Sequence, residues 1–94
     1  MPPKRSLKFE DVLKSKIHLK VIVFFHENQS CIDTPRGVST WIGEERQSVK
    51  RALEDLVELS VLNAHRTTST TGYSYTSDPK LIAKIGKFLT TRPA

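Results

Sequence analysis

Five polar side chains are grouped within six residues near the middle of this 94-residue chain: Arg46, Gln47, Ser48, Lys50 and Arg51. A guanidinium group can donate two parallel hydrogen bonds to a phosphate or to the edge of guanine, and a glutamine amide can pair with adenine. The same residues also suit a solvated helix surface, where Arg46 or Arg51 would pair with a nearby carboxylate. The elements that position the group must decide between these interpretations.

The spacing of apolar residues places this polar group on one side of a helix. Apolar residues recur at intervals of three and four, at Val49, Ala52, Leu53, Leu56 and Leu59. This pattern predicts an amphipathic helix over Arg46–Leu59. The polar group lies in its first two turns, away from the apolar stripe. A helix laid in the major groove of DNA meets the base edges with these turns.

A shorter helix is predicted directly before it. Thr34-Pro35 is a strong helix start, because threonine caps free N–H groups and proline has no N–H to leave unpaired. The helix should run to about Ile42, and Gly43 then permits the positive φ of a tight exit. Trp41 falls in the apolar stripe of this helix, so we expect it in the core or in an interface rather than on a base-stacking surface.

The polar side chains of this shorter helix form a second candidate group. Arg36 lies near its start, and Ser39 and Thr40 follow one turn later. In a helix-turn-helix, the first helix crosses the sugar-phosphate backbone while the second enters the groove. Arg36, Ser39 and Thr40 are therefore candidate phosphate contacts.

Two runs of β-forming residues, Leu62–Thr67 and Tyr73–Ser77, flank the polar segment Thr68–Gly72 and predict a β-hairpin. Arg66 lies just before the predicted tip, where the negative potential of a minor groove would attract an arginine. The hydroxyl groups of the tip, that of Thr68 included, can donate to phosphates, although a flexible polar turn has the same composition. The hairpin is thus a third candidate contact.

The first part of the chain is expected to be helical after an irregular start. Residues 1–5 contain two prolines and two positive charges, which predicts a disordered basic arm. A short helix is expected over Leu7–Lys14, and Ser15 can cap a second helix over Lys16–Glu27. In isolation, the β-branched run Val21–Val23 would fit a strand equally well.

A final helix is expected after Asp78-Pro79, which repeats the cap-and-proline signal. Its apolar stripe consists of Leu81, Ile82, Ile85, Phe88 and Leu89. Five apolar residues on a terminal helix exceed what packing on a small core requires. We therefore expect this stripe, with Leu7, Phe9 and Val12, to form a homodimer surface.

The order of these elements resembles the winged helix-turn-helix domain of MarR-like and ArsR-like transcriptional regulators of bacteria and archaea. The matching motifs are Ile42-Gly43 at the turn, the core positions Val49, Leu53 and Leu56, Val61-Leu62 at the entry to the wing, and Gly72-Tyr73-Ser74-Tyr75 in the second wing strand. The resemblance implies an α+β, mainly α, fold with a three-helix core, a two-stranded hairpin wing and a C-terminal helix. It also implies a regulator that binds double-stranded DNA as a homodimer through terminal helices. We expect the helix from Arg46 in the major groove, and the hairpin and the N-terminal arm on the phosphate backbone.

The charge distribution favours a polyanionic partner but also supports a rival. The net charge is +5, and residues 1–20 and 61–94 each sum to +4. Residues 44–60 sum to −2, because Glu44, Glu45, Glu54, Asp55 and Glu58 outnumber the positive charges there. Carboxylates at these positions suit a helix dipole but oppose a phosphate. The alternative is a winged-helix protein-interaction module that does not bind DNA, and retention on heparin would separate the two.

Other classes of protein find little support in the sequence. His18, His26, His65 and Cys31 do not stand at a metal-ligand spacing, and no cofactor or catalytic motif occurs, so we expect neither a metal site nor an enzyme. The longest apolar run, Val21–Phe25, is too short to cross a bilayer. A single cysteine agrees with a reducing compartment, and we expect one cytoplasmic domain over residues 6–94.

Overall fold

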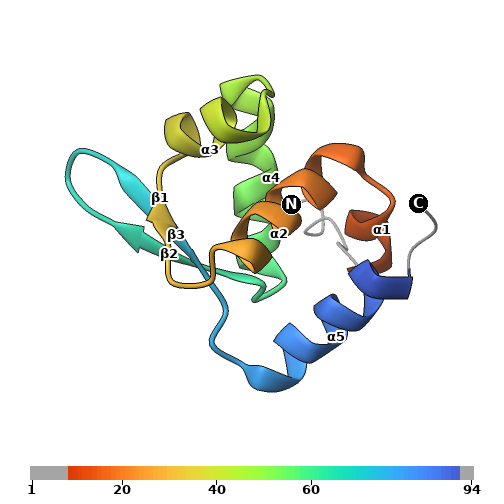
Figure 1. Cartoon of the computed structure of the whole chain (residues 1–94). Coiled ribbons are helices and arrows are strands. Elements are labelled where there is room, and N and C mark those ends of the chain that lie inside the picture. The colour runs from red at the N-terminus through yellow and green to blue at the C-terminus, as the bar shows by residue number, and fades with distance from the viewer. Residues whose placement is uncertain (1–8, 92–94) are drawn as a thin grey trace, which may run out of the picture.

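A computed structural model describes residues 9–91 and contains within them five helices and a three-stranded antiparallel sheet (Figure 1). In chain order, the elements are α1 (Phe9–Leu13), α2 (Lys16–Glu27), β1 (Ile32–Asp33), α3 (Pro35–Ile42), α4 (Arg46–Glu58), β2 (Leu62–Arg66), β3 (Thr71–Tyr75) and α5 (Pro79–Thr91). The expected arm over residues 1–5 lies outside the described residues.

The helices begin and end where local chemistry predicts. The Ser15 hydroxyl accepts a hydrogen bond from the His18 backbone N–H and caps α2, which is helical throughout the β-branched run. The Thr34 hydroxyl accepts from the Gly37 N–H at 3.2 Å and caps α3. Gly43 ends α3 in the left-handed region at φ 70°, which glycine adopts without a steric penalty. The turn between α3 and α4 is therefore set by sequence.

One core joins the helices to the hairpin. The fully buried side chains include Val21, Ile22 and Phe25 of α2, Val49, Ala52, Leu53 and Leu56 of α4, and Leu62 and Tyr73 of the hairpin. The predicted stripe of α4 thus faces inward, and Leu59 packs partly buried against the core. With one face anchored in this way, α4 presents its polar side to solvent.

The sheet differs from the prediction in two respects. Its strand order is β1-β3-β2, and the two-residue strand β1, which lies at the edge of the sheet, was not predicted. The second hairpin strand spans Thr71–Tyr75, two residues earlier than expected, because Leu62 pairs with Tyr75 and Arg66 with Thr71. The turn is correspondingly short, and the Thr67 N–H and hydroxyl both donate to the Thr70 carbonyl oxygen.

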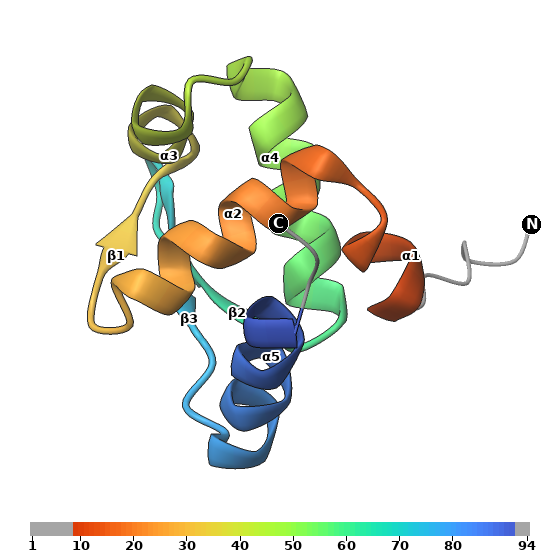
Figure 2. The same cartoon turned by 45° about the vertical axis from the view of Figure 1, so that its right-hand side comes forward.

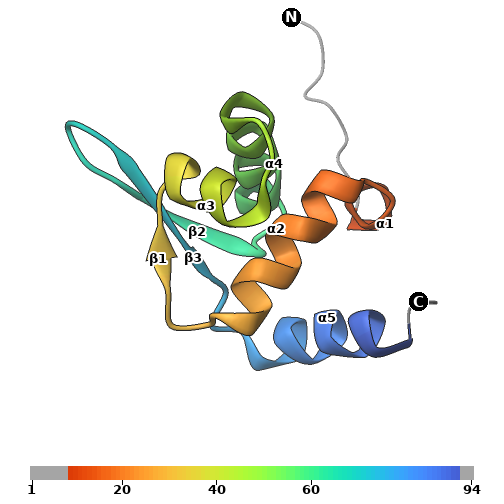
Figure 3. The same ribbon diagram turned by 45° about the horizontal axis from the view of Figure 1, so that its top comes forward.

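The terminal helices lie away from the hairpin tip (Figures 1 and 3). Val12 of α1 is only 1% exposed and belongs to the core, so its prediction as part of a dimer surface is wrong. Leu7 and the side chain of Phe9 lie outside what the structure describes. Ile85 of α5 is buried, whereas Leu81, Ile82 and Leu89 are half-buried against the core. Part of the α5 stripe therefore serves the fold itself.

Figure 2 shows α2 between α5 and the α3–α4 pair, which makes it the central helix of the domain. None of the described helices is long and apolar enough to span a membrane.

Candidate nucleic-acid interface

A concave surface runs between the start of α3, the first two turns of α4 and the hairpin tip. We call it the cationic groove; it is lined by Thr34, Pro35, Arg36, Arg46, Gln47, Lys50, Arg51, Glu54, Thr67, Ser69, Thr70, Thr71 and Tyr73. Five of the ten predicted site residues, Arg36, Arg46, Gln47, Lys50 and Arg51, line it together. The structure thus brings residues from two helices to one surface beside the hairpin.

The positive charges of the cationic groove are available to a ligand. Arg46, Lys50 and Arg51 are all exposed. Within residues 9–91, neither Arg46 nor Arg51 forms an ion pair with a carboxylate, so the local pairing that the sequence also allowed does not occur there. A phosphate entering the groove therefore meets charges that are not already neutralised.

Of the five carboxylates that would repel a phosphate, three contact other side chains of the protein. Glu44 contacts the Lys20 ammonium at 2.5 Å, and this hydrogen bond lowers the pKa of Glu44. Glu54 pairs with Arg66 at 2.9 Å, and Asp55 lies 2.9 Å from the His18 Nε2 atom. The Lys20 ammonium and the Arg66 guanidinium compensate the negative charges of Glu44 and Glu54 within the protein. The −2 sum over residues 44–60 overstates the repulsion that DNA would meet.

Arg66 is the last residue of β2 and lies just before the hairpin turn, as predicted, but its side chain pairs with a carboxylate of α4. Its guanidinium donates to both Glu54 oxygens, at 2.9 and 3.4 Å, and does not line the cationic groove. The Tyr73 hydroxyl also donates to Glu54, and burial is the main cause that raises the pKa of Tyr73 to about 12. Tyr73 therefore keeps its proton at neutral pH. Together these contacts fasten the hairpin to α4.

The other four predicted site residues, Ser39, Thr40, Ser48 and Thr68, do not line the cationic groove. The Ser39 and Thr40 hydroxyls donate to the Arg36 carbonyl oxygen at 2.9 and 3.0 Å, so their protons are engaged within α3. The Ser48 hydroxyl donates to the side chain of Glu45, the N-cap residue of α4, at 3.5 Å. Thr68 is exposed in the hairpin turn.

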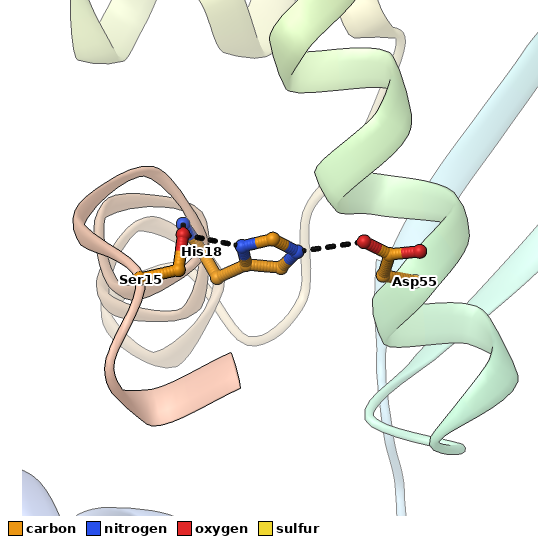
Figure 4. A network of polar contacts seen from close by, with 3 residues as sticks. All are labelled: Ser15, His18 and Asp55. Carbon is orange, nitrogen blue, oxygen red and sulfur yellow. Dashed lines mark hydrogen bonds and ion pairs between the residues drawn. The ribbon is translucent and has the colours of Figure 1, made fainter. Parts of the chain in front are cut away.

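A polar link between α2 and α4 could not be read from the sequence. The His18 ring lies between Ser15 and Asp55, with its Nδ1 atom 2.6 Å from the Ser15 hydroxyl and its Nε2 atom 2.9 Å from Asp55 (Figure 4). The His18 and Asp55 side chains are 15% and 11% exposed. Ser15 already caps α2, so the three residues form a structural bridge that fixes α4 against α2. No group of three or more potential metal ligands occurs among residues 9–91.

The arrangement of these elements matches solved structures. The fold is a winged helix-turn-helix. No protein-family profile matches the sequence, and no curated protein matches it either. This winged helix-turn-helix is similar to the homodimeric DNA-binding domain of a possible ArsR-family transcriptional regulator from Mycobacterium bovis, with a TM-score of 0.68 and 13% identity over 90% of this chain and 78% of that chain.

Two further structures share the winged helix-turn-helix. The transcriptional repressor BigR from Xylella fastidiosa gives a TM-score of 0.70 and 16% identity, covering 90% of this chain and 83% of that chain. A possible transcriptional regulator from Methanosarcina mazei gives a TM-score of 0.67 and 20% identity, covering 98% and 88%. In this fold α4 takes the position of the second helix of the helix-turn-helix and the β2–β3 hairpin that of the wing, so the predicted fold class is confirmed.

Proposed function

We propose that this protein is a transcriptional regulator that binds double-stranded DNA through the cationic groove. The observation that carries the proposal is the meeting of Arg36, Arg46, Gln47, Lys50 and Arg51 in one groove beside the wing, with no ion pair from Arg46 or Arg51 to a carboxylate in residues 9–91. In this pose α4 enters the major groove, and Arg46, Gln47 and Lys50 reach base edges. Arg36 and the hydroxyls of the wing tip contact phosphates.

Two copies of the protein are needed for tight and specific binding. One recognition helix buries too little surface to reach high affinity alone, whereas a two-fold pair reads two half-sites. The structurally similar M. bovis domain is described as homodimeric. In this chain, the half-buried Leu81, Ile82 and Leu89 of α5 offer apolar area next to the core, and we propose that α5 supplies the dimer surface.

The proposal is tested by fluorescence anisotropy with a mixed-sequence DNA duplex at two salt concentrations. Binding should weaken steeply with salt, because each phosphate contact contributes about −0.9 to the slope of log K against log salt on B-DNA. The Arg46→Glu/Lys50→Glu variant should lose binding. The Lys14→Glu/Lys16→Glu variant makes the same change in net charge at exposed positions outside the cationic groove and outside α5, and it should retain binding. Equal losses in both variants would contradict the proposed site.

The protein-interaction module is the second candidate that the sequence raised. Its support was the acidic second half of α4, yet Glu54 and Asp55 have internal partners, which leaves Glu58 as the exposed carboxylate of that half. The structure therefore offers little acidic surface there for a basic partner. Retention on heparin at moderate salt would agree with DNA binding, whereas flow-through together with no DNA binding would favour the interaction module.

A further inference from the structure

A second groove lies between α2 and α3 and has the opposite character. We call it the apolar groove; it is lined by Lys14, Lys16, Leu19, Lys20, Val23, Phe24, Glu27, Asn28, Trp41 and Ile42. Its volume of about 870 Å³ is within the range of small-molecule sites, roughly 300–1,000 Å³. The residues of the proposed DNA contact do not line it, so it is a separate feature of the molecule.

Trp41 is the residue that the fold explains least. The sequence predicted it in the core or in an interface, but it does not belong to the core, since 74% of its surface is exposed. Its ring lies 6.4 Å from that of Phe24, with 32° between the ring planes. The two rings form an apolar wall, with Leu19, Val23 and Ile42 beside them. A contiguous exposed apolar patch with polar residues at its rim is typical of an interaction site or a ligand-binding groove.

The charged residues that line the apolar groove are mostly positive. Lys14, Lys16 and Lys20 line it, against the single carboxylate of Glu27. Lys20 is bound to Glu44, which comes from the turn between α3 and α4. A ligand that fits this surface has an apolar body for the wall and a negative group for the lysines.

We infer that the apolar groove binds an amphipathic organic carboxylate, a molecule with an acyl or aromatic body and one anionic end. The body would lie against Phe24 and Trp41, and the carboxylate would be held by the ammonium groups of Lys14, Lys16 and Lys20. Burying the body removes the apolar surface of Trp41 from water, while the negative end complements the lysines. A cationic or neutral ligand of the same shape cannot form the charge interaction with the lysines.

A ligand in the apolar groove would affect the start of α4 through Lys20. A ligand carboxylate competes with Glu44 for the Lys20 ammonium, and Glu44 stands two residues before the start of α4. The release of Glu44 leaves its carboxylate without the Lys20 partner and removes a contact that holds the turn between α3 and α4. This regulatory step rests on the proposed DNA binding, whereas ligand binding itself does not.

The chain carries its own reporter, because Trp41 is its single tryptophan. Octanoate is titrated into the full chain without DNA while Trp41 emission is recorded, and octan-1-ol and octylammonium serve as neutral and cationic matches. We expect a saturable change in emission with octanoate and at least tenfold weaker responses to the other two. Equal responses to all three would overturn the carboxylate assignment, and no saturable response to octanoate would overturn the site.

The position of the ligand is tested by a pair of variants with equal charge changes. Lys14→Glu/Lys16→Glu alters the apolar groove at two exposed residues. It should weaken octanoate binding about tenfold, because each exposed ion pair contributes only modestly to the binding free energy. Arg46→Glu/Lys50→Glu alters the cationic groove and should leave octanoate binding unchanged. Identical affinities in both variants would overturn the inference. So would Trp41 emission that changes with protein concentration alone, since a second copy would then cover the wall.

The regulatory step has its own measurement, in which saturating octanoate should lower the affinity of the wild type for DNA severalfold. In Lys20→Met, which has no ammonium to compete for, octanoate should leave DNA affinity unchanged. Octanoate binding without any effect on DNA affinity would remove the coupling and keep the site. Failure of the wild type to bind DNA at all would remove the proposed function, while the emission titration would still decide the ligand site.

Discussion

The cationic groove and the apolar groove share α3 but use opposite ends of it. The start of α3 contributes Arg36 to the cationic groove, and its end contributes Trp41 and Ile42 to the apolar groove. The α4 part of the first groove was predicted from the sequence, because Arg46, Gln47, Lys50 and Arg51 lie close together on one predicted helix. The second depends on how α2 packs against α3, which no local pattern records. The eight-residue helix α3 thus contributes one end to the proposed DNA-binding surface and the other end to the proposed ligand site.

The largest expected effect is the loss of stability from a core substitution that would disturb both grooves. Leu53 is fully buried in α4 and belongs to the core on which the α4 face of the cationic groove and the α2 wall of the apolar groove both rest. Leu53→Ala should lower the free energy of unfolding by about 2–5 kcal/mol, because it removes buried methyl groups and leaves a cavity. Urea denaturation followed by circular dichroism measures this loss. Thr90→Ala, at an exposed position, is the control and should change stability by less than about 0.5 kcal/mol.

The next effect concerns the bridge that holds the helices of the two grooves together. His18 on α2 and Asp55 on α4 form a largely shielded contact, so we expect His18→Ala to lower the free energy of unfolding by about 1–3 kcal/mol. A double-mutant cycle with Asp55→Ala should give a coupling energy of about 0.5–3 kcal/mol. Additive losses would mean that the two side chains act independently and that the bridge does not position α4.

These contacts show where sequence patterns stop being informative. The apolar stripe of α4, the Thr34-Pro35 start and the Gly43 exit are local signals, and each appears in the structure as predicted. The His18–Asp55 contact joins residues 37 positions apart, and no short-range pattern records such a pairing. The same is true of the two-residue strand β1, which exists only because β3 is there to pair with it.

The predicted site residues show the same contrast between local signals and long-range contacts. Arg46, Gln47, Lys50 and Arg51 were predicted as a group because one helix positions them, and they do line one groove. Arg66 was assigned to the minor groove from its place in the hairpin, but Glu54 lies across from it on α4 and holds its guanidinium. Trp41 was expected in the core or in an interface because of helical spacing, which fixes a direction around the helix but not the presence of a neighbour.

A smaller effect distinguishes two roles for Arg66 in the wing, contact with a DNA phosphate or pairing with Glu54. If Arg66 serves Glu54, Arg66→Ala should reduce DNA affinity less than Arg46→Ala does and should leave the salt slope of binding unchanged. If Arg66 contacts a phosphate, its loss should lower the magnitude of that slope by about one. Anisotropy titrations of both variants over several salt concentrations distinguish the two. The free energy of unfolding should change little, since the Arg66 side chain is 58% exposed and solvent screens its ion pair with Glu54.

The smallest effect is a pH dependence of the same wing contact. The hydrogen bond from Arg66 is the main cause that lowers the pKa of Glu54 below its ordinary value of 4.5, and Tyr73 adds to it. A carboxylate with a lowered folded-state pKa stabilises the fold above its unfolded-state pKa, and this contribution is lost as pH falls through the folded-state value. Glu54→Gln should therefore melt below the wild type at neutral pH, and the gap should shrink as pH falls below about 4.5. A gap that stayed constant down to pH 3 would show that the Glu54 charge does not hold the wing, leaving the shape of the cationic groove to the backbone pairing of β2 with β3.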